Sequence, residues 1–134
     1  MEYSQNGYTV LADYAACRIY QAGYNTKFYL RPDECGYVLA HFARAFNDEV
    51  ENLNASDCHG FSRRRISGSS DWSNHASGTA IDVNATKHPY SREGTFNTQQ
   101  VTDLRDLLEN YDEVLRWGGD YRYTKDEMHF EIDK

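Results

Sequence analysis

The chain has 134 residues, of which 40% are hydrophobic, and its 21 acidic and 14 basic side chains give a formal net charge of −7. This length suits one core, so we expect a single domain over residues 1–134. The negative charge argues against nucleic acid as a partner, because phosphate binding needs a basic surface. No apolar run approaches the ~20 residues of a membrane span, and residues 1–7 have neither the basic start nor the apolar core of a secretory signal.

The first half of the chain predicts two helices and two strands. Residues 11–20 have a loose apolar period that favours a short helix, and residues 28–30 favour a strand that ends before Pro32. Residues 61–66 favour another strand. A longer helix is expected over residues 37–53, because apolar side chains recur there at steps of three and four: Val38, Leu39, Phe42, Phe46, Val50 and Leu53.

The second half predicts three strands around one helix. The helix spans about residues 98–111, and Asn97 with Gln100 three residues later resembles a capping box. Strands are expected over residues 80–83, 114–117 and 128–132, with alternating side chains in the first and last. Helices followed by strands in this order indicate an α+β fold with an antiparallel sheet.

Alternation places polar side chains on the strand faces opposite the core. Ile81 and Val83 point to the core, so Asp82 points away from it, and by the same rule His129 and Glu131 lie opposite Phe130. Glu131 could orient the His129 ring or be a surface charge, and alternation alone does not decide between them. His59 and His88 lie in polar stretches, where we expect solvated side chains.

Two imidazoles and one carboxylate, His75, Asp82 and His129, form a ligand set that zinc accepts with a fourth position left for water. Their spacing alone has little specificity. Asp126, three residues before His129, could serve as the general base beside that water. Strand alternation would put Asp126 on the wrong face, so it must lie in the turn before the strand or at a bulge.

Two motifs resemble those of zinc D-Ala-D-Ala carboxypeptidases and phage L-alanyl-D-glutamate endolysins. The first has the pattern Ser-x-His-x-x-Gly-x-Ala-x-Asp, and the second is Trp-Gly-Gly-Asp followed by Asp-x-x-His-Phe-Glu. In this chain they are Ser73, His75, Gly78, Ala80 and Asp82, then residues 117–120 and 126–131. Weaker similarities at residues 4–7 and 50–53 extend the resemblance over most of the chain.

This resemblance implies that His75, Asp82 and His129 bind one Zn²⁺ per chain and that Asp126 is the catalytic base. It also implies an arginine upstream of the first motif that steadies the substrate carbonyl oxygen. Arg65 matches that position best, and Arg64 is the alternative. The implied fold is the small α+β fold shared with Hedgehog-type domains, in which helices flank a central antiparallel sheet.

The function that the resemblance implies is hydrolysis of a peptide bond in the peptidoglycan stem peptide. We expect a monomeric endolysin-type L-alanyl-D-glutamate endopeptidase, or a D,D- or L,D-carboxypeptidase, that accumulates in the cytoplasm and acts at the cell wall. A non-catalytic, zinc-stabilised binding or virion structural module of the same fold is the alternative. A metal-free α+β domain is a weaker third hypothesis. The presence of Asp126 beside a complete ligand set favours the enzyme.

Overall fold

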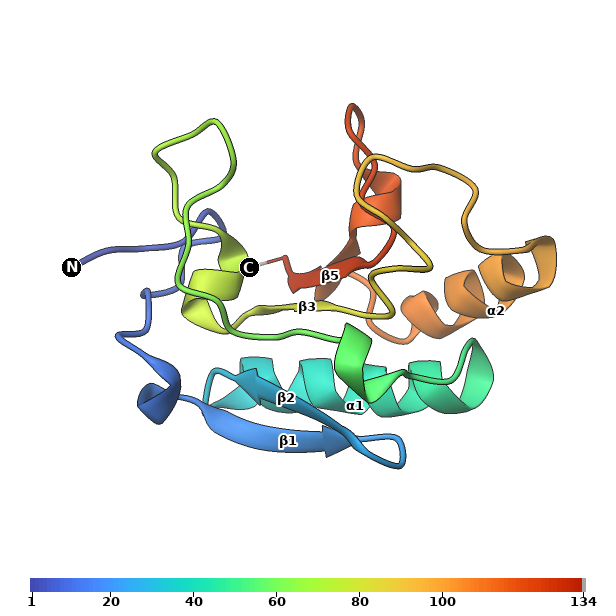
Figure 1. Cartoon of the computed structure of the whole chain (residues 1–134), viewed down its shortest axis with the longest axis horizontal. Helices are drawn as coiled ribbons and strands as arrows, with labels where there is room; N and C mark the ends of the chain where they lie inside the picture. Colours follow the sequence, from blue (N-terminus) through green and yellow to red (C-terminus); the bar gives the residue numbers. More distant parts are fainter. Residues whose placement is uncertain (134) are drawn as a thin grey trace.

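The computed structural model describes residues 1–133 and confirms the α+β fold (Figure 1). Its helices are α1 (Glu34–Glu49) and α2 (Thr98–Glu109). Strands β1 (Arg18–Ala22) and β2 (Thr26–Leu30) form an antiparallel hairpin. Strands β3 (Ala80–Asp82), β4 (Leu115–Trp117) and β5 (His129–Ile132) form a second antiparallel sheet in the order β3-β5-β4.

Short 3-10 turns complete the secondary structure of the described residues: η1 (Tyr14–Ala16), η2 (Ala55–Asp57), η3 (Asn74–Ser77) and η4 (Gly118–Asp120). No helix in residues 1–133 combines the length and the apolar character needed to cross a bilayer.

Two of the local predictions are wrong. The helix expected over residues 11–20 is only the turn η1, followed by β1, where Tyr20 and Ala22 are buried and Gln21 between them is exposed. This period of two fits the pairing with β2 and outweighs the loose helical spacing. The strand expected over residues 61–66 is reduced to one bridge between Arg65 and Trp72.

Helix α1 is the element around which the core is built. It begins three residues before the predicted start, because Asp33 caps it by accepting a hydrogen bond from the Cys35 amide at 2.9 Å. It contacts the β1–β2 hairpin as well as β5 and α2, so it lies between the two sheets (Figure 1). Phe42 packs against Phe130 of β5 with ring centroids 4.6 Å apart, and both side chains are fully buried.

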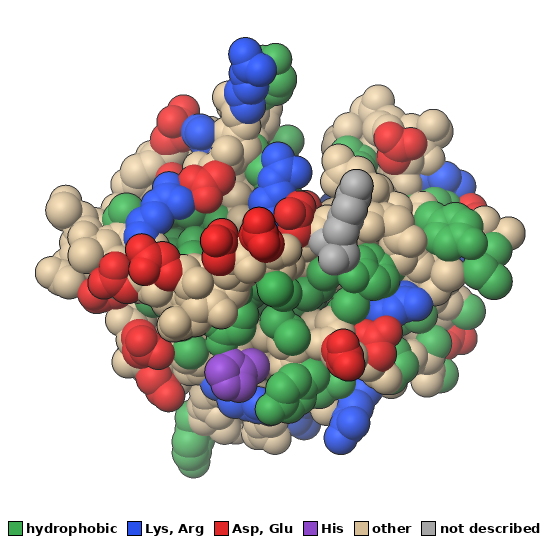
Figure 2. Space-filling model, turned by 180° about the vertical axis from the view of Figure 1, so that it is seen from behind, with side chains coloured by type: hydrophobic (Ala, Val, Ile, Leu, Met, Phe, Trp, Pro, Cys, Tyr) green, Lys and Arg blue, Asp and Glu red, His purple; other side chains and the backbone are tan. Residues whose placement is uncertain are grey.

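The predicted second helix is confirmed, with the capping box of Asn97 and Gln100 in place. Two loops, residues 63–72 and 121–125, stand above β3 and β5 in Figure 1. In the space-filling view of Figure 2 they form separate projections with a hollow between them. Strands β3 and β5 therefore lie below two projecting loops.

Candidate metal centre

The antiparallel pairing of β3 with β5 brings two of the predicted ligands together. Asp82 lies directly opposite His129 in the register, and Asp82 Oδ1 is 3.1 Å from His129 Nδ1. His75 reaches the same point from η3, with its Nε2 atom 3.3 Å from Asp82 Oδ2 and 3.2 Å from His129 Nδ1. The three residues that the sequence predicted thus meet at one place.

The turn that carries His75 is fixed at both ends. Ser73 caps η3 by accepting a hydrogen bond from the His75 amide at 3.2 Å. Gly78 ends the turn in the left-handed region with a φ of 70°, where a side chain would be strained. A Cβ at Gly78 would also lie 2.5 Å from the backbone nitrogen of Arg31. The Ser and Gly of the first motif therefore shape the turn that presents His75.

The donor atoms fit a tetrahedral metal. Ligands about 2.0–2.1 Å from Zn²⁺ in a tetrahedron lie roughly 3.3 Å from one another. His75 Nε2 lies 3.3 Å from Asp82 Oδ2, His129 Nδ1 lies 3.1 Å from the other oxygen, Oδ1, and the two imidazole nitrogens are 3.2 Å apart. Three protein ligands leave one position open, which is the pattern of a catalytic rather than a structural zinc site.

Each imidazole has a hydrogen-bond acceptor at the nitrogen that faces away from this point. His75 Nδ1 lies 2.7 Å from the Gly60 carbonyl oxygen, and His129 Nε2 lies 2.7 Å from Glu131 Oε1. Such acceptors fix the tautomer so that the other nitrogen can bind a metal. Tyr121 donates its hydroxyl to Glu131 Oε1 at 2.6 Å. Glu131 is only 4% exposed, so the surface-charge alternative is wrong.

The three donor side chains shift one another's pKa values strongly. Burial raises the pKa of Asp82, but the His75 and His129 imidazoles outweigh burial and hold that pKa far below its usual value. Burial lowers the pKa of His129, and its bonds to Asp82 and Glu131 more than reverse this and raise it to about 10. A bound cation would compete with a proton for His129.

Asp126 lies in the turn before β5, as strand alternation requires. Its carbonyl oxygen accepts the His129 amide at 3.1 Å, and its amide donates to the Gly118 carbonyl at 3.0 Å. Gly118 leaves room for this contact, since a Cβ there would be 2.1 Å from the Asp126 carbonyl oxygen. Among the described residues, the Oδ1 atom of Asp126 is the one buried side-chain oxygen or nitrogen with no hydrogen-bond partner.

The electrostatic surroundings of Asp126 suit a proton acceptor. Burial raises the pKa of its carboxyl above the usual value, and the nearby His129 charge opposes this rise only in part. Asp82 adds to the rise. A raised pKa makes a carboxylate a stronger base, and an unpartnered oxygen is free to receive a proton.

A protein-family model described as D-alanyl-D-alanine carboxypeptidase matches residues 67–132, a segment that contains the three predicted ligands and Asp126. Residues 67–132, just under half of the chain, are thus similar to the D-alanyl-D-alanine carboxypeptidase family. The match supports a peptidase activity and agrees with the resemblance seen in the two sequence motifs. Neither the curated proteins nor the solved structures contain a match to the chain.

The two candidate arginines, Arg64 and Arg65, have different surroundings. Arg65 stacks on Trp72, 3.8 Å from the ring centroid, and approaches Glu2 at 3.5 Å. Arg63 makes the same pair of contacts. Arg64 takes part in no ion pair within residues 1–133, and its charge acts on the Asp126 carboxyl by lowering the pKa that burial raises.

The structure corrects the prediction for His88. The side chain of His59 is exposed as expected, but His88 is only 1% exposed. Its Nε2 atom lies 2.8 Å from Glu51 Oε1 and its Nδ1 atom 2.7 Å from the Thr95 hydroxyl. Thr95 in turn donates to the carboxylate of Glu127, next to Asp126. No local pattern signals this network, because its members lie in separate loops.

Replacing Glu131 by Gln should weaken zinc binding by about tenfold to a hundredfold, the usual effect of losing an outer carboxylate. The reason is that a neutral amide holds the His129 ring less firmly than the carboxylate that now accepts its Nε2 proton. Competition with a chromogenic chelator measures the affinity. Tyr121→Phe removes only one donor to Glu131 and should have a smaller effect. Equal affinities in Glu131→Gln and the wild type would contradict this role.

Proposed function

We propose that this chain is a zinc peptidase that hydrolyses a bond in the peptidoglycan stem peptide. One observation carries the proposal: the buried, unpartnered oxygen of Asp126 lies beside a His75–Asp82–His129 donor set whose separations suit zinc. The similarity of residues 67–132 to the D-alanyl-D-alanine carboxypeptidase family supports the substrate class. A binding module would not need an unpartnered carboxylate at this place.

In this proposal His75 Nε2, Asp82 and His129 Nδ1 hold the metal. A bound Zn²⁺ supplies Lewis-acid chemistry, lowering the pKa of water to about 7 and polarising a carbonyl. Asp126 accepts the proton that the attacking water loses, because its Oδ1 atom has no other hydrogen-bond partner and its carboxyl interacts electrostatically with the three donor residues. The protonated Asp126 then gives that proton to the leaving amine as the peptide bond breaks.

Arg64 is the side chain that we propose for steadying the negative charge on the carbonyl oxygen. It replaces Arg65, whose guanidinium stacks on Trp72 and also donates to the Ser70 carbonyl at 2.6 Å. A cation that lies free of other ion pairs can move toward the substrate oxygen as charge develops there. Arg64 is exposed, so its side chain is free to move, and its charge is close enough to affect the pKa of Asp126.

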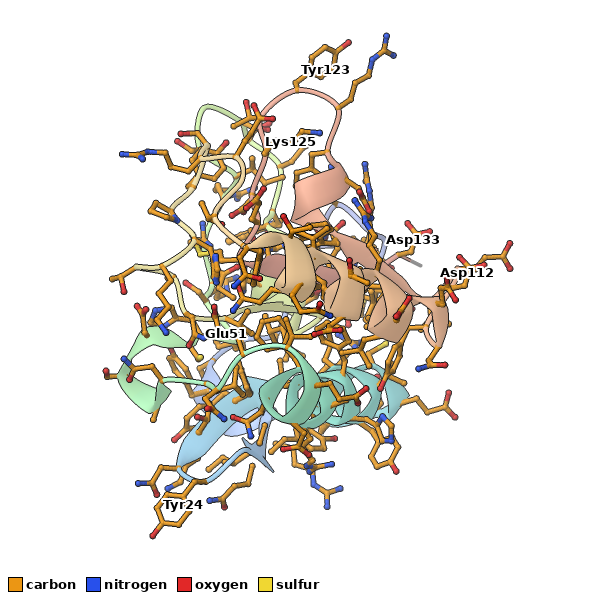
Figure 3. All side chains as sticks on the ribbon, turned by 90° about the vertical axis from the view of Figure 1, so that its right-hand side faces the viewer. Tyr24, Glu51, Asp112, Tyr123, Lys125 and Asp133 are labelled. Carbon is orange, nitrogen blue, oxygen red and sulfur yellow. The ribbon has the colours of Figure 1, made fainter. Side chains whose placement is uncertain are left out.

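The scissile bond is either L-alanyl-D-glutamate, as in an endolysin, or the bond of a D,D- or L,D-carboxypeptidase. Tyr123 points outward from the tip of the 121–125 loop and is 84% exposed, where a long substrate could touch it (Figure 3). On the face shown in Figure 2, acidic side chains are spread among basic ones, which agrees with a partner other than nucleic acid.

The test is a mass-spectrometric digest of purified peptidoglycan from walls of several stem-peptide types, using zinc-loaded protein. Release of stem-peptide fragments supports the proposal, and their new termini name the bond. If one zinc is bound per chain but no wall yields a fragment, the protein is a zinc-stabilised module instead. If no zinc binds at all, both the peptidase hypothesis and the zinc-stabilised module hypothesis fail.

Replacing Arg64 by Ala should lower kcat by about tenfold to a hundredfold, because one stabilising cation is lost from the transition state. Arg65→Ala is the matched control. It should leave kcat within about twofold, since that side chain packs on Trp72. Steady-state hydrolysis of a soluble stem peptide measures both variants. A larger loss in Arg65→Ala than in Arg64→Ala would restore the first assignment.

A further inference from the structure

A chain of buried and half-buried polar side chains runs from the end of α1 to the turn that carries Asp126. Glu51, labelled in Figure 3, follows α1 and contacts His88. His88 contacts the Thr95 hydroxyl, and that hydroxyl donates to Glu127 Oε1. His88 also stacks on Phe96, with ring centroids 3.7 Å apart. Glu51, His88 and Thr95 take no part in the metal centre or in its proposed chemistry.

The protons in this chain can be counted. The Thr95 hydroxyl has one proton and gives it to Glu127, so it must accept a proton from His88 Nδ1. His88 Nε2 then faces Glu51 Oε1 at 2.8 Å, a distance that requires a proton between them. Either His88 carries both ring protons, or Glu51 is a protonated acid.

The surroundings of Glu51 favour its ionised form. Asn84 Nδ2 donates to Glu51 Oε1 at 2.6 Å, and Gln100 Nε2 donates to Oε2 at 3.2 Å. Burial raises the pKa of Glu51, but the bonds from His88 and Asn84 outweigh burial and lower it. With Glu51 ionised, the hydrogen-bond count has His88 donating from both ring nitrogens, from Nε2 to Glu51 and from Nδ1 to the Thr95 hydroxyl.

Glu127 transmits this arrangement to its neighbour Asp126. Its carboxylate accepts the Gly94 amide at 3.0 Å and the Thr95 amide at 2.9 Å in addition to the Thr95 hydroxyl. Its carbonyl oxygen accepts the Trp117 indole N–H at 2.9 Å. The turn is therefore held on one side by Trp117 and Gly118 and on the other by residues 94–95.

We infer that His88, as a doubly protonated ring, directs the Thr95 hydroxyl onto Glu127 and so fixes the turn that presents Asp126. A neutral His88 with its proton on Nε2 would take the Thr95 proton for itself and leave two oxygens facing each other. His88 and Thr95 are thus positioning residues. Their effect on catalysis rests on the proposed peptidase function, but the fixing of the turn does not.

Thr95→Val and Thr95→Ser form a matched pair for the test, because valine keeps the shape and serine keeps the hydroxyl. Thr95→Val should lower kcat by about tenfold or more, since small displacements of a catalytic group are costly. KM and zinc content should stay the same, and Thr95→Ser should recover most of the rate. Thr102→Val, on the exposed side of α2, is the control for losing a threonine hydroxyl.

Two NMR measurements decide the inference without any activity. Nitrogen-15 spectra of the wild type should show both His88 ring nitrogens protonated. Hydrogen exchange of the Asp126 and His129 amides should be at least tenfold faster in Thr95→Val than in Thr95→Ser, with Phe42 in α1 unchanged. If the wild type cuts no peptide, the proposed function fails, and these spectra still test whether His88 and Thr95 fix the turn that presents Asp126. A singly protonated His88, or equal exchange in both variants, would overturn the inference.

Discussion

Replacing Asp126 by Asn should reduce turnover by about 10²- to 10⁴-fold, the range that a general base contributes. Asn keeps the shape of the side chain but cannot accept the proton that the attacking water loses. Asp126 does not belong to the three-residue donor set, so zinc content should remain near that of the wild type. Metal analysis measures the zinc content, and hydrolysis of a soluble stem peptide by the same sample measures the turnover.

The matched control is Asp112→Asn, an exposed carboxylate beyond the end of α2 (Figure 3). It removes the same charge from the protein and should leave the rate unchanged. If Asp126→Asn retains full activity with zinc bound, another group takes the proton and the assignment of Asp126 falls. If the variant loses zinc together with activity, Asp126 acts as a ligand, and the three-residue donor set is incomplete.

Local patterns predicted the parts of the site that lie within one element. Alternation put Asp82 and His129 on the strand faces opposite Ile81 and Phe130, and the same rule required Asp126 to sit in a turn. Alternation could not give the register that places Asp82 opposite His129, because this pairing joins strands 47 residues apart. The resemblance to a known family supplied that link.

The errors lie where long-range contacts decide the outcome. His88 reads as a loop histidine, yet its partner Glu51 is 37 residues away and draws the ring into the interior. Our proposal of Arg64 instead of Arg65 likewise rests on distant partners, since Arg65 stacks on Trp72 and approaches Glu2. A sequence shows which side chains are present in a loop, but distant partners determine which of them face the site.

Removing the metal should lower the stability of the protein, and the loss should grow as the pH rises. Zinc at about a thousandfold above its dissociation constant stabilises a fold by about 4 kcal/mol, which corresponds to a shift in melting temperature of about 10 °C for a small domain. In the metal-free protein a proton on His129 compensates Asp82 in part. Chelation therefore lowers the stability of the fold by less when His129 is protonated.

The direction of the pH effect follows from the His129 pKa, which is raised to about 10 in the folded metal-free protein. The unfolded value is about 6.5, so this stabilisation is complete below about pH 6.5 and is lost as the pH rises toward 10. Asp82 has a lowered pKa, so its contribution is lost only in acid and does not change in this window. Metal binding also strengthens with pH, since His129 must release its proton.

Thermal melts at about pH 6 and pH 9, with zinc and with chelator, measure the effect. The difference between the two melting temperatures should be larger at the higher pH. In Asp82→Asn, which lacks one ligand, the chelator should change the melting temperature little at either pH. A difference that is equal at both pH values would mean that zinc and the His129 proton do not compete. The centre would then bind its metal without Nδ1 of His129.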